Sequence, residues 1–80
     1  MKKTGKYQEC LALGKQIAHL RKEITKLSQD DFALQAGLDR TYISSIERGE
    51  RNATLMTLVK IANALEVPVS ELVKTLPSKK

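Results

Sequence analysis

Residues 27–49 read Leu-Ser-Gln-Asp-Asp-Phe-Ala-Leu-Gln-Ala-Gly-Leu-Asp-Arg-Thr-Tyr-Ile-Ser-Ser-Ile-Glu-Arg-Gly, and this stretch decides the fold. Ser28 and Asp31 form a capping box of the Ser-x-x-acid type, which predicts that a helix begins after Ser28. Gly37 predicts the end of that helix, because glycine adopts the left-handed conformation beyond a helix at no steric cost. Asp39 is a typical N-cap for the next helix. The stretch therefore predicts two short helices separated by a tight turn.

This pattern is typical of a helix-turn-helix unit, in which two helices meet at a steep angle across a turn that contains glycine. We expect the unit over residues 29–48. It needs a small residue where the helices approach, and Ala33 lies there. It needs a turn residue that tolerates positive φ, which Gly37 provides. The second helix needs an apolar inner face, which Ile43 and Ile46 supply. An ordinary helical hairpin in a bundle is the alternative.

Helical periodicity outside this unit predicts three further helices. Apolar residues recur at spacings of four, three and four from Leu13 to Ile24, which predicts a first helix over residues 9–24. Thr54 is a typical N-cap for a fourth helix, and Pro68 predicts the start of a short fifth. In the last two helices we expect inward-facing side chains at Leu55, Leu58, Ile61, Ala62, Leu65 and Leu72. The expected fold is all-α, a compact arrangement of five helices.

The length of 80 residues allows one small domain, which buries only about 60–65% of the surface of its unfolded chain. We expect a flexible N-terminal arm at residues 1–8, the folded domain at residues 9–76 and a frayed tail at residues 77–80. The C-terminal helices of the domain are expected within residues 54–76. So small a core leaves little room for the deep, water-excluded pocket of an enzyme.

The net charge of +5 favours nucleic acid as a partner, with an anionic membrane surface as the second possibility. The sequence has no apolar run of the ~20 residues that a membrane span needs, and its charged start precedes no apolar signal-peptide region. We therefore expect a cytoplasmic protein that does not enter the membrane. Cys10 is the single cysteine and cannot form an internal disulfide, which agrees with a reducing compartment.

Catalytic and metal-binding residues are not arranged in any pattern that predicts chemistry. One cysteine and one histidine, His19, cannot complete a closed Cys/His zinc site. No nucleophile–base–acid set and no phosphate-cradling glycine loop is present. We expect no enzyme activity, no cofactor, no metal and no small-molecule ligand.

Two parts of the sequence resemble the Cro/phage-repressor (XRE) helix-turn-helix family: residues 27–49, and residues 55–72, which end in Ala-Leu-Glu-Val-Pro-Val-Ser-Glu-Leu. Residues 38–48, followed by Arg51 and Asn52, are similar more narrowly to controller proteins of restriction-modification systems, which are small homodimeric regulators that bind their own promoter. The resemblance implies a lambda-repressor-like DNA-binding domain. It implies a transcriptional regulator that binds a palindromic double-stranded operator as a homodimer, with autoregulation of a restriction-modification operon as the narrower expectation. The alternative is an antitoxin-like module that neutralises a partner protein.

The outer face of the second helix of the unit is expected to read bases in the major groove. The residues expected there are Arg40, Thr41, Ser44 and Ser45. Arg40 can form a bidentate contact with guanine O6 and N7, while the hydroxyl and methyl groups of Thr41 suit thymine. The serines are short and let the helix lie close to the bases. A merely solvated polar face is the alternative.

A second group is expected to contact the DNA backbone: Gln29, Tyr42, Arg48, Arg51 and Asn52. Gln29 lies at a helix N-terminus, where free amide groups can hold a phosphate. Tyr42 would reach a phosphate or a deformable base step, and a partly buried packing role is the alternative. Asp30 and Asp31 would repel that phosphate, so we expect them to be turned aside as helix caps.

Glu47 needs a cationic partner, because an acid near a helix C-terminus and near DNA is disfavoured twice. The resemblance implies that this partner is Arg21 and that the pair aligns the first helix with the DNA-reading helix.

Apolar residues beyond the needs of one core predict a dimer surface on the last two helices. They are Met56, Val59, Val69, Val73 and Leu76. Completion of the core by Val69 and Val73 is the alternative.

The sequence departs from the family pattern in two places. Residues 24–26 form a loop that is one residue longer and lacks the usual glycine, and Leu34 and Met56 occupy positions that are usually polar.

Overall fold

The computed structural model describes residues 7–77, and this part of the chain contains five α-helices, one π-helical turn and no strand. The helices are α1 (Gln8–Leu20), α2 (Gln29–Ala36), α3 (Arg40–Glu47), α4 (Leu55–Leu65) and α5 (Val69–Val73), and the π-helical turn η1 (Arg21–Thr25) continues α1. The all-α, five-helix prediction is confirmed. The expected arm and tail lie outside the described residues except for residues 7, 8 and 77, and Gln8 already belongs to α1.

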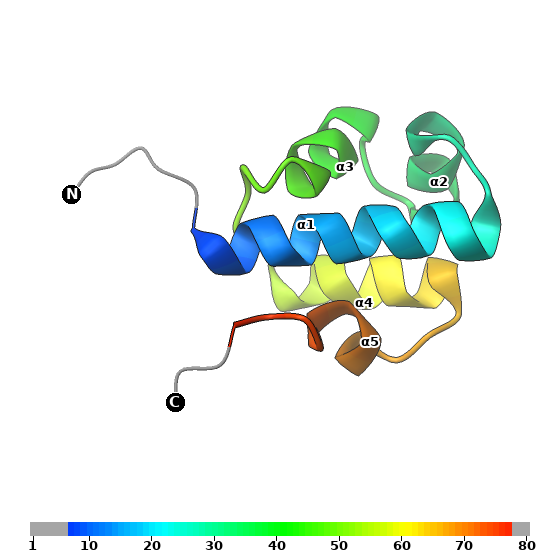
Figure 1. The fold of residues 1–80 in the computed structure, drawn as a ribbon. Helices are drawn as coiled ribbons and strands as arrows, with labels where there is room; N and C mark the ends of the chain where they lie inside the picture. Colours follow the sequence, from blue (N-terminus) through cyan, green and yellow to red (C-terminus); the bar gives the residue numbers. More distant parts are fainter. Residues whose placement is uncertain (1–6, 78–80) are drawn as a thin grey trace.

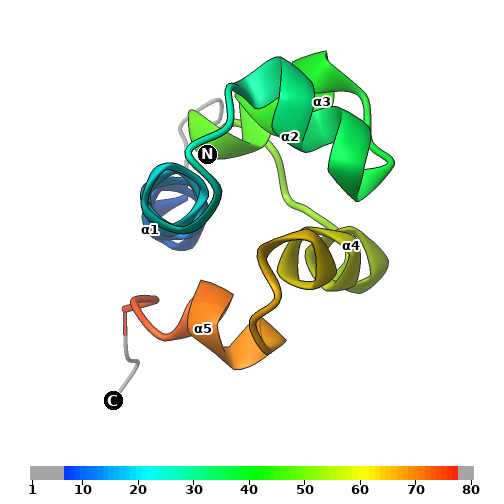
Figure 2. The same ribbon diagram turned by 90° about the vertical axis from the view of Figure 1, so that its right-hand side faces the viewer.

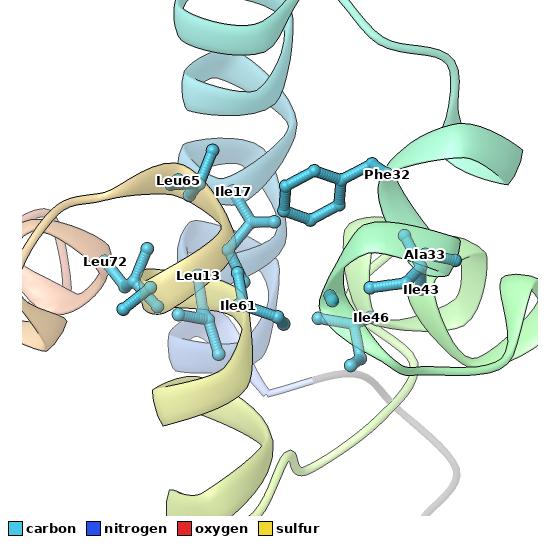
Figure 3. Close-up of a cluster of buried hydrophobic side chains, with 11 residues drawn as sticks. Leu13, Ile17, Phe32, Ala33, Ile43, Ile46, Ile61, Leu65 and Leu72 are labelled. Atoms are coloured by element: carbon cyan, nitrogen blue, oxygen red, sulfur yellow. The ribbon is translucent and has the colours of Figure 1, made fainter.

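The helices pack on both sides of α1, with α2 and α3 on one side and α4 and α5 on the other (Figure 1). The view along α1 shows all five around one interior (Figure 2). Every α-helix contributes to the core, and Figure 3 shows most of these side chains converging between α1, α2, α3 and α4. The buried apolar residues are Leu13, Ile17, Phe32, Ala33, Ala36, Ile43, Ile46, Ile61, Ala62, Leu65 and Leu72. A fully buried side chain of the larger type contributes about 1.5–3 kcal/mol, so this interior holds the helix-turn-helix unit against α1 and α4.

The helix starts and the tight turn follow the sequence signals. Ser28 Oγ accepts a hydrogen bond from the Asp31 N–H at 3.1 Å, and Asp39 Oδ2 accepts one from the Thr41 N–H at 3.0 Å. Thr54 Oγ1 caps α4 in the same way. Gly37 has a φ of 72°, the left-handed conformation that a side chain would strain. These local features set α2 and α3 apart as separate short helices.

The loop after α1, which we expected to be one residue longer than usual, is accommodated by the π-helical turn η1. The N–H of Lys26 donates to the carbonyl of Arg21, five residues back, at 3.0 Å, which is the wide π-type pattern. Lys26 itself adopts φ 59°, so a lysine takes the left-handed conformation that glycine adopts at no steric cost. Thr25 Oγ1 secures the turn by donating to the Arg21 carbonyl at 2.7 Å and accepting from the Leu27 N–H at 3.1 Å.

Two residues expected to face the core are exposed, Ile24 at 47% and Leu55 at 68%. The prediction for Ile24 is wrong because η1 has a wider repeat than an α-helix and turns this side chain off the stripe of α1. The prediction for Leu55 is wrong because the buried stripe of α4 runs through Thr57, Ile61 and Leu65 at four-residue spacing, and Leu55 lies beside it.

Candidate nucleic-acid interface

The first turn of α3 presents polar side chains on the face that points away from the core. Arg40 and Thr41 are exposed and Ser44 is half-buried. Ile43 and Ile46 are buried on the opposite face, so α3 is firmly packed beneath its polar side. Figure 1 shows α3 and α2 together at one edge of the molecule, on the far side of α1 from α5. A helix held in this way can enter a groove without losing its place in the fold.

Ser45 does not belong to this exposed face. Its side chain is buried, with the residue only 7% exposed, and its Oγ donates to the Tyr42 carbonyl at 2.9 Å. The expectation that Ser45 lies on the outer face is therefore wrong. It follows Ser44 by one position, about 100° around the helix, which is enough to move a side chain from the surface to the interior.

The side chain of Thr41 is hydrogen-bonded to Asp39, the N-cap residue of α3. Its hydroxyl donates to Asp39 Oδ2, the carboxylate oxygen that also accepts the Thr41 backbone N–H. The hydrogen bond from the Thr41 side chain lowers the pKa of the Asp39 carboxyl below its usual value. The carboxylate is thus ionised at neutral pH and holds the Thr41 hydroxyl in one orientation, with the methyl group left for apolar contact.

Tyr42 lies half-buried between α3 and α4. Its hydroxyl is 3.3 Å from Thr57 Oγ1, and the guanidinium of Arg51 lies over its ring at 5.3 Å from the centroid. This geometry matches the alternative of a packing tyrosine. It also gives the ring a second use, because a cation over an aromatic face is attracted to it and Arg51 is held beside α3.

The segment between α3 and α4 carries the other expected backbone contacts. Arg51 and Asn52 are exposed. Arg48 donates to Glu50 Oε1 at 2.9 Å and also to Ser44 Oγ. The hydrogen bond to Glu50 raises the pKa of Arg48 above its ordinary value. Arg48, Arg51 and Asn52 are therefore exposed polar residues that directly follow α3 in the chain.

Arg21 and Glu47 form the ion pair that the resemblance implied. Arg21 Nε donates to Glu47 Oε2 at 2.8 Å and Nη2 donates to Oε1 at 2.9 Å, while Nη1 donates to the Leu27 carbonyl at 2.8 Å. The two side chains are 8% and 6% exposed. A bidentate pair with so little exposure connects η1 to the end of α3 and sets the position of the polar face relative to α1.

Gln29 is drawn into this buried network. Its side-chain amide donates to Glu47 Oε1 at 2.7 Å and is therefore directed toward the ion pair. Asp30, the next residue, is not turned aside as a cap. Its Oδ1 lies 2.5 Å from Arg40 Nε, so the expectation for Asp30 is wrong. The pair joins the first turns of α2 and α3 across the surface.

The residues expected at a dimer surface differ in exposure. Met56 is 62% exposed. Val59, Val69, Val73 and Leu76 are half-buried. Val69, Val73 and Leu76 also pack against the core, in partial agreement with the alternative that they complete it. Leu34 on α2 is 81% exposed and lies apart from them in the sequence.

Within residues 7–77, no group of three or more His, Cys, Asp or Glu side chains is placed to hold a metal ion. His19 is exposed, and Cys10 is half-buried and not in a disulfide. In the same part of the chain, every helix is too short or too polar to cross a membrane.

Comparison with known proteins matches residues 17–72 to the HTH_3 helix-turn-helix family. The chain belongs to this family. Its relatives in the comparison are regulators of transcription, so the HTH_3 protein is a DNA-binding regulator and not an enzyme.

One similar relative is the control protein C.MunI from a Mycoplasma species, 52% identical over 62 residues, which are 78% of this chain and 84% of the relative. A similar solved structure is the restriction-modification controller protein C.AhdI from Aeromonas hydrophila, 38% identical with a TM-score of 0.79, covering 82% of this chain and 98% of that one. The biofilm master regulator SinR, solved in complex with DNA, is 36% identical with a TM-score of 0.71, covering 75% of this chain and 95% of that one.

Two residues that position the polar face of the HTH_3 protein were not found from the sequence. Gly14 lets α1 approach α3, because a Cβ at this position would lie 2.4 Å from the Ile46 carbonyl oxygen and 2.6 Å from that of Glu47. Its signal in the sequence was a glycine inside a helical pattern, where glycine is otherwise unfavourable. Thr57 anchors the hydroxyl of Tyr42, and its signal was a polar residue at a core spacing of α4.

Proposed function

We propose that the chain is a cytoplasmic transcription regulator that binds a palindromic operator sequence-specifically as a homodimer and autoregulates a restriction-modification operon. The exposed first turn of α3 is the main support for sequence-specific binding. It presents Arg40 and Thr41 on a helix whose other face is fully packed. The similarity to C.AhdI, which extends over nearly the whole of that chain, supports the restriction-modification context.

In this proposal α3 enters the major groove. Arg40 contacts guanine O6 and N7, and Thr41 and Ser44 lie against neighbouring base edges. Arg48, Arg51 and Asn52 bind phosphates beside the groove, with Arg51 oriented by the ring of Tyr42. Gln29 helps to bind a phosphate through the free backbone N–H groups at the N-terminus of α2, while its side chain stays hydrogen-bonded to Glu47. Ser45 is left out, because it is buried.

Arg40→Ala is expected to relax sequence preference without unfolding the domain. A bidentate arginine–guanine contact discriminates against other bases by about 1–3 kcal/mol, so the preference should fall at one position of each half-site. Fluorescence anisotropy against a duplex selected by the wild-type chain from a random pool, and against a shuffled duplex, measures this. Lys60→Ala, which removes an exposed positive charge from α4, is the control. An Arg40→Ala variant that keeps the wild-type ratio of the two affinities would rule out base reading by Arg40.

The dimer is proposed because one module of this size covers too little DNA for an operator, about 600–1,000 Å². A twofold pair doubles the contact and places half-sites about 34 Å apart or a multiple of one turn. The apolar side chains at Met56, Val59, Val69, Val73 and Leu76 extend over α4, α5 and the chain after it. Met56 is exposed and the other four are half-buried, and apolar side chains left partly exposed in this way are typical of an interaction surface.

Val73→Asp with Leu76→Asp is expected to give a monomer with much weaker operator binding, as measured by sedimentation and anisotropy. Because both side chains also pack on the core, Met56→Asp serves as a second variant at an exposed position. It should weaken the dimer while leaving the domain folded, with an unchanged circular dichroism spectrum, although Tm falls by the stability that association contributes. A wild-type chain that sediments as a monomer at tens of micromolar would contradict the dimer, and so would unchanged association of both variants.

An antitoxin-like module that neutralises a partner protein is the second candidate, favoured by the exposed apolar side chains of Leu34 and Leu55. The response to salt separates the two functions. Phosphate contacts lower log K by about 0.9 per unit of log salt for each phosphate neutralised, whereas an apolar contact responds little. Wild-type protein that binds DNA without this slope, or does not bind DNA, would favour the antitoxin.

A further inference from the structure

We propose that Asp39 is a positioning residue that determines which group of a base Thr41 binds. The inference rests on the DNA-binding function proposed above. By accepting the proton of the Thr41 hydroxyl, Asp39 leaves the Thr41 oxygen able only to accept a hydrogen bond. The donors of the major groove are adenine N6 and cytosine N4, whereas thymine O4 and guanine O6 are acceptors. Thr41 is thus directed to an amino group of adenine or cytosine.

The start of α3 fixes the two side chains relative to each other. Asp39 is the N-cap residue of the helix, and its Oδ2 accepts the backbone N–H of Thr41 at 3.0 Å. The same oxygen accepts the Thr41 hydroxyl. Both residues are exposed, so a base in the groove can reach the Thr41 oxygen. A hydroxyl has one proton and two lone pairs, and with the proton donated only the lone pairs are left for the base.

Capping alone does not require a carboxylate at position 39. Ser28 and Thr54 cap α2 and α4 with neutral hydroxyl groups, and asparagine or serine caps a helix about as well as aspartate. What the charge adds is strength, because a hydrogen bond to an ionised acceptor is roughly twice as strong as a neutral one. The bond from the Thr41 side chain is also the main cause of the lowered pKa of Asp39.

The bond to Asp39 costs nothing on an amino group and is costly on a carbonyl oxygen. When a base amine donates to the Thr41 oxygen, the bond between Thr41 and Asp39 is kept. Facing a carbonyl, Thr41 must either oppose one lone pair with another or withdraw its proton from Asp39. The second choice exchanges a charge-assisted bond for a neutral one. Because the cost falls only on the wrong base, Asp39 increases discrimination.

Ser44 is in the opposite state on the same face of α3. It follows Thr41 by three residues, a spacing that places two side chains side by side on a helix. Its oxygen accepts a hydrogen bond from Arg48, so its own proton remains available to a base acceptor. The neighbours of each hydroxyl therefore set its hydrogen-bonding role, and Ser44 is a hydroxyl that Asp39 does not control.

The experiment begins with a duplex that the wild-type chain selects from a random pool. Each base pair is then inverted in turn, with deoxyuridine in place of thymine so that no methyl group moves. Inversion exchanges the amino group and the carbonyl oxygen in the major groove. Thr41→Val keeps the shape of the side chain without its hydroxyl, so the pair whose inversion penalty falls in this variant is the one that Thr41 reads. At this pair, replacing the amine with a carbonyl should weaken wild-type binding about tenfold.

Asp39→Asn tests the carboxylate itself. The asparagine still caps α3, but it is neutral, and its amide can donate to the Thr41 oxygen and free the hydroxyl proton. The inversion penalty at the pair read by Thr41 should fall to about threefold or less, while the penalties at other pairs, including the one that Ser44→Ala affects, should not change. Asp39→Ser, with another neutral cap, is expected to behave in the same way. Thermal melts establish that each variant is folded.

Asp31→Asn is the control for charge, since it removes an exposed acid from the first turn of α2. It should change the affinity for every duplex by one factor and leave each inversion penalty as in wild type. In the Asp39→Asn background, Thr41→Val should change the penalty much less than it does in wild type, because the two residues act together.

Three results would overturn the inference while the DNA-binding function stands. They are a wild-type preference for the carbonyl at the pair read by Thr41, no pair that responds to Thr41→Val, and an unchanged penalty in Asp39→Asn and Asp39→Ser. Penalties that change at every pair in these two variants would likewise overturn it, because they would show that Asp39 only holds α3 in place. If the wild-type chain enriches no sequence from the pool, the proposed function is wrong and this inference falls with it.

Discussion

Glu47→Ala is expected to lower the free energy of unfolding by about 3–5 kcal/mol, because it leaves the guanidinium of Arg21 buried without its carboxylate. Arg21 would keep only the Leu27 carbonyl among the hydrogen bonds described above. Arg21→Ala should cost as much, since the Glu47 carboxylate would keep only the Gln29 amide as a bonded side-chain donor. For a domain of this size, either change should lower Tm by more than about 10 °C.

Urea and thermal unfolding followed by circular dichroism measure this effect. Lys74→Ala is the control, since it removes an ion pair to Glu71 whose side chains are 57% and 39% exposed, and exposed pairs contribute little. The double variant Arg21→Met with Glu47→Met should be more stable than either alanine variant, because apolar replacement of both partners strands no charge. Alanine variants that melt within a degree or so of wild type would contradict a stabilising buried pair.

Gly14→Ala is expected to destabilise the protein by about 1–3 kcal/mol, although alanine is the better helix former. Propensity alone predicts a gain of about 1 kcal/mol in the interior of α1. The added Cβ would lie 2.4 Å from the Ile46 carbonyl oxygen, a backbone atom that cannot turn away as a flexible side chain can. The clash can be relieved only by moving α1 away from α3, so the polar face of α3 should shift with it.

His19→Ala isolates the propensity effect, because His19 is exposed in the same helix. This control should be as stable as wild type or slightly more so. Urea unfolding of the two variants separates the effect of helix propensity from that of the clash. The operator affinity of Gly14→Ala reports the displacement of α3. A Gly14→Ala protein more stable than wild type would contradict the tight approach of α1 to α3 at Gly14.

The sequence was sufficient where a structure depends on neighbours within one turn of the chain. Ser28, Asp39 and Thr54 cap their helices as predicted, and Gly37 takes its left-handed conformation, because each outcome rests on hydrogen bonds and sterics among adjacent residues. Family resemblance added the pairing of Arg21 with Glu47, which spacing alone could not predict across the residues between them.

Tertiary packing decided the features that depend on what lies opposite a side chain. The polarity of Ser45 predicted exposure, yet its place on α3 faces the interior. Gln29 and Asp30 are adjacent in the first turn of α2, but one joins the buried pair and the other reaches Arg40. The neighbours of Gly14 within α1 do not show why glycine is needed there, because the backbone atoms with which a Cβ would clash belong to α3. The sequence by itself therefore determined the five helices and the turn, because short-range hydrogen bonds specify them. Only the packing of α1, α2 and α3 decided the orientation and partners of the polar side chains, because those contacts join residues far apart in the chain.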